Sequence, residues 1–101
     1  MVEKFSAVFS SSAKKYISGL TVQEQASFAA DIDVMKTGEI GKVQTKQLRG
    51  QVRELIVGYH RMSYFLHEHV LYFIEGWRKK TSKTPKRYID FAIKTFKEIK
   101  G

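Results

Sequence analysis

The chain has 101 residues, 43% of them hydrophobic and none of them cysteine, which fits one domain over residues 1–101 and excludes disulfides and thiolate metal sites. No apolar run approaches the roughly 20 residues of a membrane span, and the N-terminus lacks a signal-peptide layout, so we expect a cytoplasmic protein. The net charge of +8 belongs to the second half, because residues 42–101 hold fourteen Lys/Arg and five acidic residues, while residues 1–41 hold four lysines and five acidic residues.

The first half of the chain predicts one strand and two helices. Residues 4–9 alternate apolar with short or polar side chains, as a strand does. Helical spacing of apolar residues predicts a short helix over residues 13–20, after a serine-rich turn that can cap it. Residues 21–24 (Thr-Val-Gln-Glu) match a capping box and open a longer helix that ends at residues 37–38. The apolar side chains that we expect in the core are Phe5, Ala7, Phe9, Ala13, Tyr16, Ile17, Leu20, Phe28, Ile32 and Met35.

The second half predicts three strands and a final helix. Residues 39–46 are polar and predict a connection without regular structure. Strand-like runs then cover residues 51–57, 61–67 and 70–77, and the links are short enough for hairpins. Thr84 can cap the last helix, with Pro85 in its first turn. This order predicts an α+β fold with an antiparallel or mixed four-stranded sheet, two N-terminal helices and a C-terminal helix.

The middle strand of this predicted sheet should present two different faces. Side chains alternate across a strand, so those of Met62, Tyr64 and Leu66 lie together, and we expect them to pack against the helices. The opposite set contains Arg61, Ser63, Phe65 and His67. We expect this second face to be more open, with Arg61 projecting from it.

Residues 76–85, which read Gly-Trp-Arg-Lys-Lys-Thr-Ser-Lys-Thr-Pro, connect the last strand to the last helix. They carry Arg78, Lys79, Lys80 and Lys83, and the nearest acidic residue is Glu75. Four cations at a strand exit are not needed to fold a domain, so we interpret this stretch as a site for a polyanion. Nucleic acid is favoured over a membrane surface, because arginines and aromatic residues lie between the lysines.

Residues 59–65 (Tyr-His-Arg-Met-Ser-Tyr-Phe) followed by residues 75–85 resemble the HigB-like, phage-derived branch of the RelE toxin superfamily, and the order of elements is similar as well. The sequence departs at two positions: Ile56 stands where the family has an arginine after Glu-Leu, and Glu75 stands where it has a histidine. The resemblance implies a type II toxin, an endoribonuclease that cleaves mRNA, usually in the ribosomal A site. It also implies a partner, a small helix-turn-helix (HigA-like) antitoxin.

RNA cleavage by the 2′-OH needs a base for its proton, cations for the phosphorane charge and an acid for the leaving 5′ oxygen. Arg61 is our candidate for stabilising the phosphorane, and the alternative is an ion pair with Glu54. Either Lys79 or Lys80 supplies acid or base chemistry, if neighbouring cations disfavour its charged form, or both bind phosphate as ordinary cations. Glu54 is a further candidate base.

Two histidines, His60 and His67, could shuttle protons near neutral pH, and the alternative is that both are partly exposed turn residues. The three histidines show no metal-ligand spacing, so we expect neither a metal nor another cofactor.

Backbone phosphates of RNA are the ligands that we assign to the remaining cations, namely Lys46, Arg49, Arg53, Arg78, Lys83 and Lys86. Trp77 could stack on a base, and the alternative is a core position. Two rival functions stay open. One is a non-catalytic basic nucleic-acid-binding module, although neither early helix has a basic recognition face. The other is a degenerate toxin-fold interaction protein, which is supported by the departures from the family pattern at Ile56 and Glu75.

Overall fold

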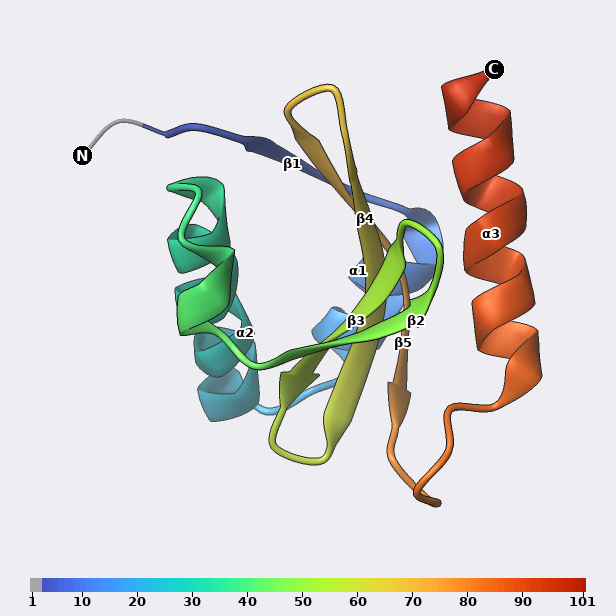
Figure 1. Cartoon of the computed structure of the whole chain (residues 1–101). Coiled ribbons are helices and arrows are strands. Elements are labelled where there is room, and N and C mark those ends of the chain that lie inside the picture. Colours follow the sequence, from blue (N-terminus) through green and yellow to red (C-terminus); the bar gives the residue numbers. More distant parts are fainter. Residues whose placement is uncertain (1–2) are drawn as a thin grey trace.

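Five strands form one mixed sheet with helices on both faces in the computed structural model, which describes residues 3–101 (Figure 1). The strand order is β1-β5-β4-β3-β2, with β1 parallel to β5 and all other neighbours antiparallel. The elements are β1 (Ser6–Phe9), α1 (Ser11–Ser18), α2 (Val22–Lys36), the 3₁₀ helix η1 (Ile40–Lys42), β2 (Thr45–Arg49), β3 (Val52–Val57), β4 (His60–His67), β5 (Val70–Arg78) and α3 (Lys86–Lys100).

The predicted α+β fold is confirmed, but the sheet has five strands and not four. The additional strand is β2, within and beyond the segment that we predicted as an irregular connection. Its sequence, Thr-Lys-Gln-Leu-Arg, is polar because β2 is an edge strand, and only Thr45 and Leu48 are partly buried. Charged side chains on an edge strand discourage pairing with other chains, and they also hide the strand from a hydrophobicity pattern.

Helix α2 begins where its capping box predicts, whereas α1 begins at Ser11, two residues before the predicted start, with Ser10 as its cap. The Ser10 hydroxyl accepts a hydrogen bond from the Ala13 N–H at 3.1 Å and donates one to the Ile74 carbonyl of β5. At the start of α2, the Thr21 hydroxyl accepts from the Glu24 N–H (3.1 Å), and the Glu24 carboxylate accepts from the Thr21 N–H (2.9 Å). Each cap satisfies backbone donors that the first helical turn leaves free.

Two hydrophobic cores lie on opposite faces of the sheet. Helices α1 and α2 cover one face and α3 covers the other, as Figure 1 shows. The first core is made of Ala13, Phe28, Ile32, Met35, Leu55, Met62, Tyr64, Leu71 and Phe73. The second is made of Val52, Phe65, Ile74 and Ala92. The prediction for Met62 and Tyr64 is therefore confirmed. The opposite face of β4 is not open as expected, because α3 packs on Phe65, which is fully buried.

A bulge in β5 reverses the side on which its last residues point. Ser63 pairs with Glu75 and the next residue of β4, Tyr64, pairs with Phe73, so Ile74 has no partner. One extra residue shifts the alternation of a strand. Gly76 therefore faces α1, and Trp77 joins the α3 side, directly opposite Arg61.

None of the helices within residues 3–101 has the length and apolar character to cross a membrane.

The ring of Tyr16 in α1 lies directly on the backbone of Gly76, which makes this glycine a sensitive position. A methyl group there would lie 2.6 Å from Cγ of Tyr16 and 3.0 Å from Cε of Met62. We expect Gly76→Ala to lower the free energy of unfolding by about 1–3 kcal/mol, measured by urea denaturation, because the core must shift to admit it. Gly41→Ala is the matched control, since nothing lies within 4 Å of its added methyl group. Equal stability of both variants would contradict this packing.

Candidate nucleic-acid cleft

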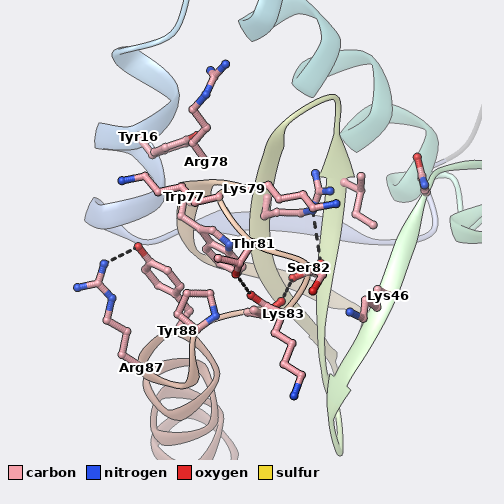
Figure 2. A pocket seen from close by; sticks show the side chains of 18 residues that line it. Tyr16, Lys46, Trp77, Arg78, Lys79, Thr81, Ser82, Lys83, Arg87 and Tyr88 are labelled. Atoms are coloured by element: carbon pink, nitrogen blue, oxygen red, sulfur yellow. Dashed lines mark hydrogen bonds and ion pairs between the residues drawn. The ribbon is translucent and has the colours of Figure 1, made fainter.

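A cleft of about 690 Å³ opens at the end of the sheet where β5 leads into α3, and we call it the basic cleft (Figure 2). Its floor comes from β2, β3, β4 and β5, and its walls come from residues 79–85 and the first turn of α3. It is lined by Tyr16, Gln44, Lys46, Glu54, Ile56, Arg61, Gly76, Trp77, Arg78, Lys79, Lys80, Thr81, Ser82, Lys83, Thr84, Pro85, Arg87 and Tyr88. The backbone N–H of Lys79 donates to the Tyr59 carbonyl (2.7 Å), which fixes the strand exit to the β3–β4 turn.

The basic cleft has a large excess of positive over negative side chains. Seven of its lining residues are Lys or Arg, and one, Glu54, is acidic. Arg61 is ion-paired with Glu54. The other six cations form no ion pair within residues 3–101, and they are Lys46, Arg78, Lys79, Lys80, Lys83 and Arg87. Unpaired cations around a concave surface concentrate positive potential there, which favours a polyanionic ligand.

The floor of the cleft holds Arg61 in a buried network. Its Nε lies 3.6 Å from a carboxylate oxygen of Glu54, and its Nη1 donates to the carbonyls of Gly58 (2.8 Å) and His60 (3.0 Å). The other carboxylate oxygen of Glu54 accepts from the Thr84 hydroxyl at 2.7 Å. This network ties residue 84 of the wall to the floor of the cleft.

The network corrects two predictions. Arg61 is only 9% exposed, so it does not project freely from the sheet, and the ion pair with Glu54 that we held as the alternative is present. Thr84 does not cap α3, because its hydroxyl is used by Glu54, and Pro85 occupies the cap position without a side-chain hydrogen bond. Arg61 still lines the cleft through its remaining surface, in company with Lys79 and Lys80.

An aromatic stack forms one wall of the cleft. The rings of Trp77 and Tyr88 lie parallel, with centroids 4.3 Å apart and planes at 5°. Arg87 lies over Tyr88 at 4.7 Å and donates to its hydroxyl at 2.8 Å, as Figure 2 shows. Trp77 is only 5% exposed, and one face of its ring is covered by Tyr88. Trp77 is therefore a core residue, which was the alternative to stacking on an RNA base. Arg87 and Tyr88 were not among the predicted site residues, although they lie two and three residues after the basic stretch of residues 76–85.

Several residues predicted to bind RNA do not line the cleft. Arg49 and Lys86 both approach Asp90, at 3.6 Å and 3.9 Å. Arg53 donates to the Thr45 hydroxyl at 3.1 Å. Glu75 lines a neighbouring hollow of about 480 Å³ beside α1, where burial raises the pKa of its carboxyl and Arg87 partly opposes this.

The two candidate histidines lie in different environments. His67 shares the face of Arg61, but it is six residues away along β4, which corresponds to about 20 Å, and it packs edge-on against Phe96. His60 is not a partly exposed turn residue, because it is 6% exposed. Within residues 3–101, no group of three His, Cys, Asp or Glu side chains is placed to hold a metal ion.

His60 is the centre of a chain of three polar side chains from three elements. Its Nδ1 lies 2.7 Å from the Tyr16 hydroxyl of α1, and its Nε2 lies 2.6 Å from the Glu24 carboxylate of α2. We call this chain the Glu24–His60–Tyr16 relay. Tyr16 also lines the basic cleft, so the relay connects the cleft to the opposite side of the sheet. Nothing in the spacing of these residues along the sequence could have predicted it.

Two solved structures share this fold at low sequence identity. One is the archaeal RelE–RelB complex from Pyrococcus horikoshii OT3, with a TM-score of 0.68, 13% identity, and coverage of 78% of this chain and 99% of that chain. The other is the RelB–RelE antitoxin–toxin complex from Methanococcus jannaschii, with a TM-score of 0.61, 12% identity, and coverage of 70% and 88%. The protein therefore has the RelE fold, as its sequence predicted.

A comparison of the sequence with models of protein families identifies the family of this chain. A family model described as "Phage derived protein Gp49-like (DUF891)" matches residues 15–97, which is most of the chain. This protein belongs to the Gp49-like family. No match was found among curated proteins.

The relay makes stability depend on pH in a specific range. The hydrogen bond from His60, together with those from Thr21, lowers the pKa of Glu24 from 4.5 to about 2. The folded state therefore favours the carboxylate, so its contribution to stability is present above pH 4.5 and is lost as the pH falls towards 2. We expect Glu24→Gln to flatten the pH dependence of the unfolding free energy in this range, measured by urea denaturation. Asp33→Asn on the exposed side of α2 is the control, and identical curves for wild type and Glu24→Gln would exclude this role.

Proposed function

We propose that this protein is a HigB-like toxin of a type II toxin–antitoxin system and acts as a single toxin domain in the cytoplasm. Its activity is the cleavage of mRNA on the ribosome, without a metal ion, by attack of the 2′-OH on the adjacent phosphate. The Gp49-like family and the RelE fold support the toxin class. One observation carries the ribonuclease assignment: six cations that form no ion pair within residues 3–101 line one cleft together with a buried arginine.

Arg61 stabilises the phosphorane in this proposal. Its Nη1 and Nε are used by backbone carbonyls and Glu54, while its Nη2 makes no hydrogen bond within residues 3–101. A guanidinium that is fixed before substrate arrives offers its free N–H groups without reorganisation, and such preorganised donors contribute strongly to catalysis. The burial of Arg61 therefore supports a positioned catalytic cation, in place of the mobile one that an open sheet face would provide.

Lys79 and Lys80 hold the phosphates on either side of the scissile bond. Both are exposed, both follow directly after β5, and both line the same cleft as Arg61. Two roles fit this position: a fixed positive charge, and proton transfer to or from the RNA. Arginine at both positions preserves the rate under the first role, because the charge remains. It lowers the rate under the second, because a guanidinium does not give up its proton.

The proton acceptor of the reaction is neither Glu54 nor His67 in this proposal. Glu54 is engaged by Arg61 and Thr84, which favours a positioning role. His67 lies at the far end of β4. Lys46, Arg78, Lys83 and Arg87 bind backbone phosphates from the rim of the cleft.

An antitoxin is the expected protein partner. Both structural neighbours are described as complexes of RelE with RelB. We propose that this chain is likewise neutralised by a small protein, and the resemblance to the HigB-like branch favours a helix-turn-helix antitoxin of the HigA type.

A degenerate toxin fold without catalysis is the second candidate. Ile56 favours it, because this residue lies on the cleft floor directly opposite Arg61, where the resembled family has an arginine. Such a protein would bind RNA or an antitoxin without cleaving RNA. Growth arrest on expression, relieved by a co-expressed antitoxin, separates the toxin from this alternative.

Removing the two exposed lysines of the cleft tests the proposed ribonuclease. We expect Lys79→Ala/Lys80→Ala to lower mRNA cleavage in a purified translation system by at least about 10-fold, because charge next to the phosphorane is lost. Both side chains are exposed, so the melting temperature should stay unchanged. The control Lys94→Ala/Lys97→Ala removes the same charge from α3 outside the cleft and should cleave normally. Equal losses in both double variants would point to bulk charge and against the cleft.

The shape of the arginine side chain is tested separately by Arg61→Lys. Lysine retains the positive charge opposite Glu54 but cannot present a planar fork to phosphate, so we expect a loss of about 100-fold in the cleavage rate. Cleavage is measured under single-turnover conditions and folding by circular dichroism. A folded Arg61→Lys protein with the wild-type rate would remove Arg61 from the mechanism.

A further inference from the structure

The Glu24–His60–Tyr16 relay has a defined direction of hydrogen bonding. A carboxylate only accepts, so His60 must donate to Glu24 through Nε2–H. In the neutral ring, Nδ1 is then the acceptor, and the Tyr16 hydroxyl donates its proton to it. A hydroxyl, an imidazole and a carboxylate in this order form an arrangement in which the hydroxyl can pass its proton to the ring.

The relay is protected from solvent at its centre. His60 is 6% exposed, and its ring packs edge-on against Tyr16 and at a tilt against Phe28, with centroids 5.7 Å and 5.9 Å away. Burial leaves the imidazole few partners other than Tyr16 and Glu24. A low-dielectric surrounding also strengthens the attraction between a protonated His60 and the Glu24 carboxylate.

Tyr16 is the member of the relay that reaches the basic cleft. Its ring lies against the backbone of Gly76, and a residue with a Cβ at that position would collide with the ring. Burial raises the pKa of the Tyr16 hydroxyl, while the charge of Arg78 lowers it and Glu24 and Tyr88 raise it. These groups come from the cleft rim, α2 and α3, so the hydroxyl lies within electrostatic reach of the cleft.

We propose that Tyr16 exchanges the proton of the attacking 2′-OH, with His60 and Glu24 as positioning residues. This inference rests on the proposed ribonuclease function and supplies the base that Glu54 and His67 do not.

The proposed step conserves protons and bonds. The Tyr16 oxygen takes the 2′-OH proton while its own proton moves to Nδ1 of His60, and Glu24 stabilises the resulting imidazolium. The 2′ oxygen forms a bond to phosphorus, and the bond from phosphorus to the 5′ oxygen breaks. The 5′ oxygen takes a proton from solvent and leaves as a hydroxyl, and the other product ends in a 2′,3′-cyclic phosphate. The relay then returns its proton to solvent.

Other charged groups around the relay act on the same titration. Arg78 faces it from β5 and Tyr88 from α3. Lys15 of α1 and Glu75 of β5 line the hollow on the other side of Tyr16. The pH dependence of the reaction therefore reports the whole group, and variants of the relay must be compared with a control that leaves these charges unchanged.

The test is the pH–rate profile of RNA cleavage by the full chain and its variants. We expect Tyr16→Phe to lower the rate by about 100-fold and to abolish the acidic limb of the profile, because the proton path is lost. The matched control is Tyr72→Phe, which removes the hydroxyl of a half-buried tyrosine at the other end of β5 and should retain the wild-type rate. Thermal denaturation establishes that each variant is folded.

A second variant keeps the proposal testable if Tyr16→Phe does not fold. Glu24→Gln leaves Tyr16 in place but no longer stabilises the imidazolium. We expect it to lower the rate by at least about 10-fold and to move the acidic limb to lower pH. Wild-type protein that does not cleave RNA would refute the proposed function. An active wild type, with both variants folded and unchanged in rate and profile, would refute the relay alone.

Discussion

The buried ion pair between Arg61 and Glu54 is the interaction on which the cleft depends. It places a permanent positive charge at the floor, and Glu54 extends it to the wall through Thr84. Breaking such a pair by removing one partner costs about 3–5 kcal/mol, because the other charge stays buried and unpaired. The cleft therefore cannot exchange Arg61 for a neutral residue without loss of stability, and its position is fixed before any ligand binds.

Two features of the sheet bring the remaining groups to this pair. The bulge at Ile74 turns Trp77 towards α3 and leaves Gly76 facing α1, so one strand serves both sides of the sheet. The ring of Tyr16 packs directly on Gly76, and its hydroxyl is hydrogen-bonded to His60, so Tyr16 links the cleft to the opposite face of the sheet. In this arrangement the cations proposed to bind phosphate and the side chains proposed to move protons come from different layers and meet at the end of β5.

Features that depend on neighbouring residues in sequence were predictable, and features that depend on packing were not. The capping box at Thr21 and the cationic run after β5 have local signals, and both were placed correctly. The burial of His60 arises from two helices that pack over it. The bulge at Ile74 adds one residue to β5, and the alternation of side chains in the sequence does not predict it. β2 was missed for a related reason, since an edge strand buries too little to show an apolar pattern.

The proposed activity of the basic cleft is to bind a ribose–phosphate chain and to break it by attack of the chain's own 2′-OH. The most direct measurement compares an RNA that the protein cleaves with the same RNA carrying a single 2′-deoxy nucleotide at the cleaved position. We predict that the deoxy substitution abolishes cleavage at that bond, and that the all-ribose RNA yields a cyclic or 3′ phosphate and a 5′-hydroxyl. Cleavage of the deoxy-substituted bond, or products with a 5′ phosphate, would contradict the account.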